Sequence, residues 1–166
     1  MGLSHSFKVA RKKCRLLNDD EKNAALAICR DIHQAQRALK RKAAPILANC
    51  MIKCKGLCCK NIRPDDIITQ WDLVFILLLS PHLEPEIASC VEKEGFFPED
   101  CIFLKNGTGP CLFPDNQRPE RCVISFCRLE PTVEKEISHV MGGFSRLIRY
   151  FMMRPYGRVW RLLFPS

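Results

Sequence analysis

The stretch from Thr69 to Leu79, TQWDLVFILLL, is the most informative part of this chain for its fold. Its last seven residues are all apolar, and Ser80-Pro81 follows as a helix stop because the residue before a proline disfavours helical backbone. Asp66 or Thr69 is suited to cap the start of the helix. A helix that is apolar on nearly all sides has to be buried. We therefore expect a second helix of the chain, through Trp71 to Leu79, that is covered on most of its surface.

Three further helices are expected on either side of this stretch. After Asn18, a candidate N-cap followed by acidic residues, apolar residues recur close to every 3.6 positions. This pattern predicts one long helix over residues 19–47, with a bend near Pro45. A shorter acidic helix is expected over residues 84–94, and a last helix over residues 132–153. The fold class predicted is a small, mainly α protein whose helices frame a cysteine-rich, loop-dominated metal-binding segment.

The length of 166 residues suits a single domain in three parts. Residues 1–48 are expected to form a basic N-terminal arm and the long helix, residues 49–131 the cysteine-rich core, and residues 132–166 a basic C-terminal helix and tail. Charge follows this division, since residues 1–60 hold 14 Lys/Arg against 4 Asp/Glu, whereas residues 61–140 hold 7 against 14. Residues 141–166 hold 5 arginines and no acid. The net charge of +8 therefore arises from the two ends of the chain.

Cysteine is the unusual residue of this composition, with 11 in the chain. The first 17 residues lack the apolar stretch of a secretory signal, and no apolar run approaches the roughly 20 residues that span a bilayer. We therefore expect a reducing, cytoplasmic location, with peripheral contact at the inner membrane face as a further option. In such a compartment, clustered cysteines favour metal or iron–sulfur ligation over disulfides, and an odd number leaves one unpaired.

Eight of these cysteines are candidate ligands, and together we call them the cysteine cluster. Four form the pattern C-x3-C-x3-C-C, and four follow in a segment rich in proline and glycine. Thiolates are soft ligands suited to zinc and to iron–sulfur clusters, and a bound metal can order a segment that buries little apolar surface. Both metals stay open, with a [4Fe–4S] cluster favoured over Zn²⁺. The expected ligands are Cys50, Cys54, Cys58, Cys59, Cys101, Cys111, Cys122 and Cys127.

The order of these motifs resembles the YkgJ-type cysteine-cluster family, described as a zinc- or iron-chelating domain. The similarity rests on C-x3-C-x3-C-C, then Cys101-Ile-Phe-Leu, Cys111-Leu-Phe and Arg118-Pro-Glu-Arg-Cys122, and it covers roughly residues 50–127. The resemblance implies metal binding by seven of the eight cysteines and implies no reaction. Cys127 is added by its proximity alone. The three residues before Cys58 depart from the family, which commonly has one or two there.

Arg118 is expected to bind near the cofactor, because an arginine beside clustered thiolates would offset their charge and donate hydrogen bonds to sulfur. An ordinary surface arginine is the competing interpretation. Cys29 and His33 share a helix face, a spacing that core packing explains more simply than ligation. Cys14 and Cys90 stand apart from the cysteine cluster, and no phosphate loop or H-E-x-x-H motif is present.

Three functions remain open at this point. The first is metal binding with a structural, electron-transfer or redox-sensing role. The second is a cluster-dependent enzyme that acts on a protein or metal substrate. The third is a module whose basic ends dock on a membrane or nucleic acid, with the cysteines held as disulfides. For the basic ends, an acidic protein partner or an anionic membrane surface is favoured over nucleic acid.

Overall fold

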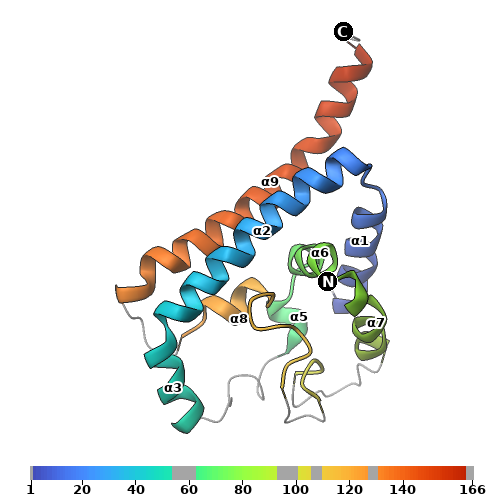
Figure 1. Ribbon diagram of the computed structural model, residues 1–166. Coiled ribbons are helices and arrows are strands. Elements are labelled where there is room, and N and C mark those ends of the chain that lie inside the picture. The colour runs from blue at the N-terminus through green and yellow to red at the C-terminus, as the bar shows by residue number, and fades with distance from the viewer. Residues whose placement is uncertain (1, 54–62, 93–100, 106–109, 127–130, 164–166) are drawn as a thin grey trace.

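The structure is a computed structural model, and it describes residues 2–53, 63–92, 101–105, 110–126 and 131–163. Helices dominate these residues, as the sequence predicts (Figure 1). The longest two, α2 (Asp19–Lys42) and α9 (Glu134–Leu163), lie side by side and antiparallel. Beneath this pair lies α6 (Gln70–Leu79), which also contacts α1 (Leu3–Arg15). The described part of the chain is therefore a mainly α fold.

Helix α6 is the buried centre that the sequence predicts. Every residue from Asp72 to Leu78 is buried, and Phe75 meets Phe144 of α9 with ring centroids 5.2 Å apart. Thr69 caps the helix, since its hydroxyl accepts from the backbone N–H groups of Trp71 and Asp72. Of the two expected caps, Thr69 is thus the one used. The helix ends at Leu79, ahead of Ser80-Pro81, as the proline rule predicts.

The long N-terminal helix begins at its expected cap but is shorter than predicted. Asn18 and Glu21 form a reciprocal capping box, which satisfies two backbone N–H groups at the start of α2. The prediction of one helix over residues 19–47 is wrong at its C-terminal end, because α2 ends at Lys42 and a separate helix, α3 (Ala44–Lys53), turns away from its axis (Figure 1). The break lets Pro45 lie in the first turn of α3, where its missing N–H costs nothing.

Helix α1 is not among the helices that the sequence predicts. It places Leu3, Phe7 and Ala10 against the core, while its cations lie elsewhere on its surface. The backbone N–H of Leu3, at the first turn, donates to the Asp65 carboxylate. Asp65 belongs to the short helix α5 (Pro64–Ile67). A carboxylate distant in sequence therefore accepts a hydrogen bond from one of the free N–H groups at the start of α1.

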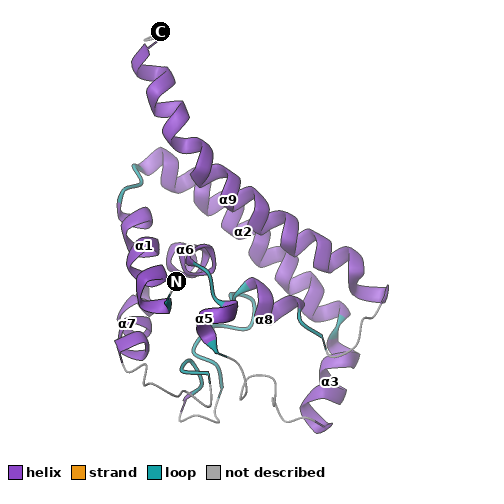
Figure 2. Ribbon diagram, turned by 180° about the vertical axis from the view of Figure 1, so that it is seen from behind, coloured by secondary structure: helices purple, strands orange, loops and turns teal. Residues whose placement is uncertain are grey.

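The acidic helix is confirmed as α7 (Glu84–Glu92), which follows a 3₁₀ turn at Pro81–Leu83. The last helix is longer than the predicted 132–153, since α9 follows a 3₁₀ turn at Pro131–Val133 and runs from Glu134 to Leu163. The helix continues past Pro155, although proline has no backbone N–H to donate to the preceding turn. Its end extends past the start of α2, away from the other helices (Figures 1 and 2).

Among the described ranges, no single helix is long and apolar enough to cross a membrane. Helix α6 and the segment Pro81–Glu92 have the required length and composition only when taken together, and they are bent by 117° at the break between them.

Candidate metal centre

The structure describes half of the cysteine cluster. Cys54, Cys58, Cys59 and Cys127 lie outside the described residues. Cys50 lies in α3, so the loop-dominated character expected of the core over residues 49–131 is wrong at its start, where the helix continues to Lys53. Cys101 and Cys111 are half-buried, and Cys122 is exposed. The remainder of the C-x3-C-x3-C-C pattern, at residues 54–59, falls outside the described ranges.

Cys101 and Cys111 lie on two short segments that pair with each other. Leu104 and Cys111 form an antiparallel bridge, and the N–H of Leu112 donates to the carbonyl of Phe103 at 2.7 Å. The N–H of Leu104 donates to the carbonyl of Cys101 at 2.9 Å. Phe103 is buried against Phe113 of the second segment, with ring centroids 4.6 Å apart. This contact anchors the cysteine-bearing turn to the helical core.

The thiol of Cys111 is in an environment that keeps it neutral without a metal. Burial raises its pKa, and so does the negative charge of Asp115, whereas a hydrogen bond from the backbone of Phe113 and the positive charge of Arg118 lower it. A metal binds the thiolate, so it has to displace this proton. Arg118, the residue expected to offset thiolate charge, is therefore near enough to Cys111 to favour the ionised form.

Arg118 and Lys40 converge on one carboxylate. Arg118 Nη2 lies 2.5 Å from Asp115 Oδ1, and Lys40 Nζ lies 2.5 Å from Asp115 Oδ2. The bond from Lys40 and the charges of both cations lower the pKa of Asp115. The Nε atom of Arg118 is buried and has no hydrogen-bond partner among the described residues. Nη2 of the guanidinium is thus paired with Asp115, whereas Nε has no acceptor among the described residues.

The backbone around Arg118 is held by a buried glutamine of α2. The side chain of Gln36 donates from Nε2 to the Arg118 carbonyl at 2.8 Å, and its Oε1 accepts from the Arg118 N–H at 3.2 Å. Gln36 is 1% exposed, although it occupies a position where the helix otherwise places apolar residues. A buried amide is stable only when its hydrogen bonds are made. Gln36 therefore fixes this loop in one position on the helix.

A second buried polar group, Asp72 of α6, binds the backbone at Glu120, two residues after Arg118. Its Oδ1 accepts from the N–H of Glu120 at 2.6 Å, and its Oδ2 accepts from the N–H of Thr69 at 2.8 Å and the hydroxyl of Thr69 at 2.7 Å. Burial raises the pKa of Asp72, and the donated hydrogen bonds oppose that rise. One carboxylate thus caps α6 and also receives the first N–H of α8 (Glu120–Ile124), which carries Cys122.

A third contact fixes the same segment, since the hydroxyl of Ser80 donates to Gln117 Oε1 at 2.5 Å. Ser80 is 4% exposed. None of these anchoring contacts is predicted from the sequence. Two of them carry a signal, because Gln36 stands in the apolar period of its helix and Asp72 directly precedes the apolar run of α6. A polar residue at a core position indicates a buried partner without saying which one. The anchoring residues are Gln36, Asp72, Ser80 and Gln117.

A cavity of about 350 Å³ lies beside Cys122, and the segment anchored by these residues forms one of its walls. Lys40, Arg118 and Asp115 provide its charged groups. Its apolar surface comes from α2 and α3 on one side and from the chain around α8 on the other. The apolar lining residues are Leu39, Ala43, Leu47, Val123 and Phe126.

Of the pair Cys29 and His33 singled out from the sequence, Cys29 belongs to the core. Cys29 is fully buried, and burial raises the pKa of its thiol to about 12. His33 is half-buried, and burial together with Arg37 lowers its pKa. The interpretation of this pair as core packing is thus confirmed for Cys29.

Within the ranges that the structure describes, no three His, Cys, Asp or Glu side chains are grouped so that they could hold a metal ion. Ligation by the cysteine cluster therefore stays a prediction. The chain matches no protein-family model, no curated protein and no solved structure, so the resemblance to the YkgJ-type family also stays a prediction.

Proposed function

We propose that this chain is a metal-binding protein of the YkgJ-like type, in which the cysteine cluster holds an iron–sulfur cluster or Zn²⁺. Its role is structural, electron-transferring or redox-sensing, in a reducing, cytoplasmic compartment. One observation carries the proposal. Two helices of the core use buried polar side chains, Gln36 and Asp72, to fix the backbone between Cys111 and Cys122.

This arrangement supports a binding site for a physical reason. A buried polar side chain contributes little net stability, and an apolar residue of the same shape would often serve the core as well. A buried polar side chain is understandable where the position of a loop matters, because metal ligands on that loop have to be held within about 0.5 Å of their productive geometry. The charge of Arg118 favours the thiolate of Cys111, while Asp115, its ion-pair partner, has the opposite effect.

The direct test is to purify the protein without oxygen, record its visible spectrum, and measure zinc, iron and acid-labile sulfide per chain. Matching iron and sulfide would identify an iron–sulfur protein, and one or two zinc ions in a colourless protein would identify a zinc protein. Absence of both metals, together with paired thiols, would overturn the proposal and favour the disulfide-held docking module.

Variants distinguish ligands from spectators. Cys111→Ser and Cys122→Ser are expected to lose metal, whereas Cys29→Ala is the matched control because Cys29 lies in the apolar core. Gln36→Leu removes both hydrogen bonds to Arg118 without touching a thiol. We expect it to weaken metal binding about 10- to 100-fold, the usual effect of losing a supporting contact around a metal site. Full metal content in both serine variants would contradict the assignment of these ligands.

A cluster-dependent enzyme is the second candidate, and the cavity beside Cys122 is the observation that favours it. A site of about 350 Å³ is within the range of small-ligand pockets, and Lys40 and Arg118 at its wall suit a substrate with an anionic group. A change in the spectrum of the metal-loaded protein on adding small carboxylic acids would support this candidate. An unchanged spectrum with every acid tried would leave metal binding as the better description.

A further inference from the structure

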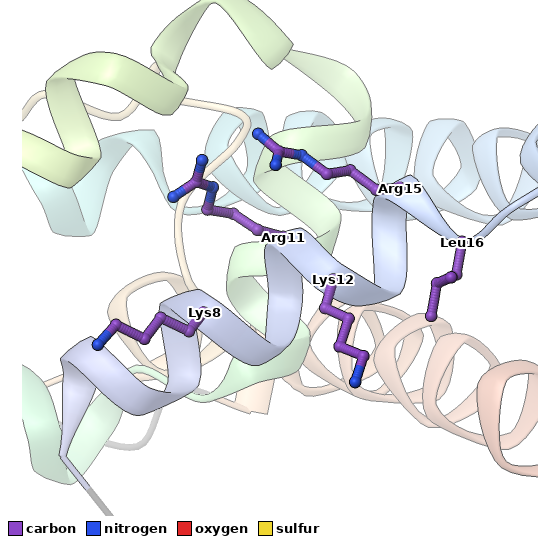
Figure 3. A pocket seen from close by; sticks show the side chains of 5 residues that line it. All are labelled: Lys8, Arg11, Lys12, Arg15 and Leu16. Atoms are coloured by element: carbon purple, nitrogen blue, oxygen red, sulfur yellow. The ribbon is translucent and has the colours of Figure 1, made fainter.

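Helix α1 carries a stripe of cations along one face. Lys8, Arg11, Lys12 and Arg15 are spaced three and four residues apart, so they share one side of the helix. A second side of the helix, with Leu3, Phe7 and Ala10, faces the core. Together with Leu16, the four cations line a hollow of about 310 Å³ (Figure 3). Helix α1 itself contains no acidic residue.

Only part of this charge is balanced within the described residues. Arg11 and Arg15 extend to the same side of α1 (Figure 3), where both pair with one oxygen of Glu84, at 2.7 and 3.0 Å. Lys8 and Lys12 are exposed, and among the described residues no ion pair of either lysine is found. The face therefore keeps an excess of positive charge.

One exposed aliphatic side chain, that of Leu16, lies next to this charge. Leu16, at the end of α1, is 56% exposed. Its carbonyl accepts a hydrogen bond from Arg154 of α9, and Met152 and Met153, directly before Arg154, are 62% and 56% exposed. Arg154 also pairs with Glu21 at 2.7 Å, which fixes α9 against the turn between α1 and α2. A cationic face and one exposed aliphatic side chain, Leu16, thus occur together where α1 ends beside α9.

We propose that this α1 face, defined by Lys8, Arg11, Lys12, Arg15 and Leu16, docks on an anionic lipid surface. The cations would contact lipid phosphates and carboxylates, and Leu16 would enter the boundary between headgroups and acyl chains. The exposed apolar side chain of this face favours lipid over nucleic acid, because Leu16 is aliphatic and offers no aromatic ring for base stacking. This inference uses none of the cysteine cluster, so it stands or falls independently of the proposed function.

The test measures binding of the full chain to vesicles of phosphatidylcholine alone and of phosphatidylcholine with about 30% phosphatidylserine, by flotation in about 0.1 M salt. We expect binding to the anionic vesicles only, and its loss near 0.5 M salt because ions screen exposed charges. Lys8→Gln/Lys12→Gln is expected to lower the partition coefficient about 10- to 30-fold, given the usual contribution of each lysine near a lipid surface. Leu16→Ser is expected to lower it about fivefold.

The matched control is Lys42→Gln/Lys135→Gln, which removes the same charge at the opposite end of the α2–α9 pair. It is expected to bind like the unaltered protein. Equal losses in both double variants would show that net charge alone drives binding and would overturn the proposal, as would the absence of vesicle binding. Tighter, salt-sensitive binding to a single-stranded oligonucleotide without vesicle binding would assign the face to nucleic acid instead. Glutamine keeps the helix propensity of lysine, and far-ultraviolet circular dichroism checks the fold of each variant.

Discussion

At the scale of single residues, Asp72 connects the central helix to the loop that carries Cys122. Its carboxylate accepts hydrogen bonds from Thr69 and Glu120, which are 3 and 48 positions away in the sequence. It is 2% exposed, so no solvent replaces these bonds when they are lost. This single side chain therefore affects both the cap of α6 and the position of the candidate metal centre.

We predict that Asp72→Ala lowers the free energy of unfolding by about 2–4 kcal/mol, because it removes a cap and leaves buried donors without acceptors. Chemical denaturation of the two proteins measures this difference. Asp66→Ala is the matched control, since Asp66 is exposed, and its effect is expected to stay within about 0.5 kcal/mol. Similar losses in both variants would show that the buried hydrogen bonds of Asp72 are not the cause.

The cysteines differ in their expected reactivity. Burial raises the pKa of Cys14 and of Cys29 to about 12, from an ordinary value of 9.0. At pH 8 their thiolate fraction is therefore about a thousandfold below that of a thiol with the ordinary value. Because only the thiolate reacts, we expect slow alkylation of both residues by iodoacetamide, with a rate that rises about tenfold per pH unit.

Mass spectrometry of the labelled peptides measures these rates with and without a chelator. The cysteine-cluster ligands are expected to become more reactive when metal is removed, whereas Cys14 and Cys29 are expected to stay slow in both samples. Rapid labelling of Cys29 in the folded protein would contradict its assignment to the core.

At the scale of secondary-structure elements, the contact between α2 and α9 depends on one glycine. A Cβ atom placed on Gly143 would lie 2.7 Å from Cγ1 of Ile32, closer than real side chains approach. Ile32 is fully buried and β-branched, so it has little freedom to move away. A Cβ atom placed on the preceding residue, Gly142, would meet no described atom within 4 Å, so Gly142 provides a matched comparison.

We predict opposite effects for the two glycines. Gly142→Ala is expected to raise the free energy of unfolding by about 0.5–1 kcal/mol, because alanine favours the helix more than glycine does. Gly143→Ala gains the same propensity but overpacks the contact with Ile32, which costs about 1–3 kcal/mol. Thermal unfolding of both variants tests the difference. Equal stabilisation would mean that α2 and α9 separate at little cost.

At the scale of the whole molecule, the hydrophobic core of the described residues is formed mainly by the helices, and Cys101 and Cys111 pack against it without being part of it. Among the described residues, Cys29 is the one cysteine in the fully buried core, and the loop contributes Phe103 and Phe113 to that core. The remaining core side chains come mainly from the helices, with α6 at the centre. The helices therefore have their own apolar contacts, independent of any metal.

We accordingly predict that a chelator leaves the helical circular dichroism signal largely intact while it makes residues 101–126 more sensitive to proteolysis. The reason is that metal binding would stabilise a segment with little buried apolar surface of its own. Limited proteolysis followed by mass spectrometry locates the cuts. General loss of helical signal on chelation would instead show that the metal holds the whole fold together.

The sequence by itself determines four of the helices, α2, α6, α7 and α9, and the caps at the start of α2 and α6. Asn18 with Glu21 and Thr69 with Asp72 are three positions apart, and the apolar run of α6 is continuous. Such signals act within one helical turn, so they are visible without any knowledge of the fold. The cysteine pattern likewise predicts the kind of chemistry, because thiolates favour a small set of metals.

The tertiary structure alone decides which distant groups meet. Gln36 and Arg118 are 82 positions apart, and Asp72 and Glu120 are 48 apart, yet each pair is joined by buried hydrogen bonds. Helix α1 also depends on a distant group, since the N–H of Leu3 donates to Asp65, 62 positions away. Polar side chains can pair with any buried partner that packing brings within reach, so their sequence positions do not identify the partner. Packing of the helices, rather than local pattern, therefore sets the loop around the candidate metal centre.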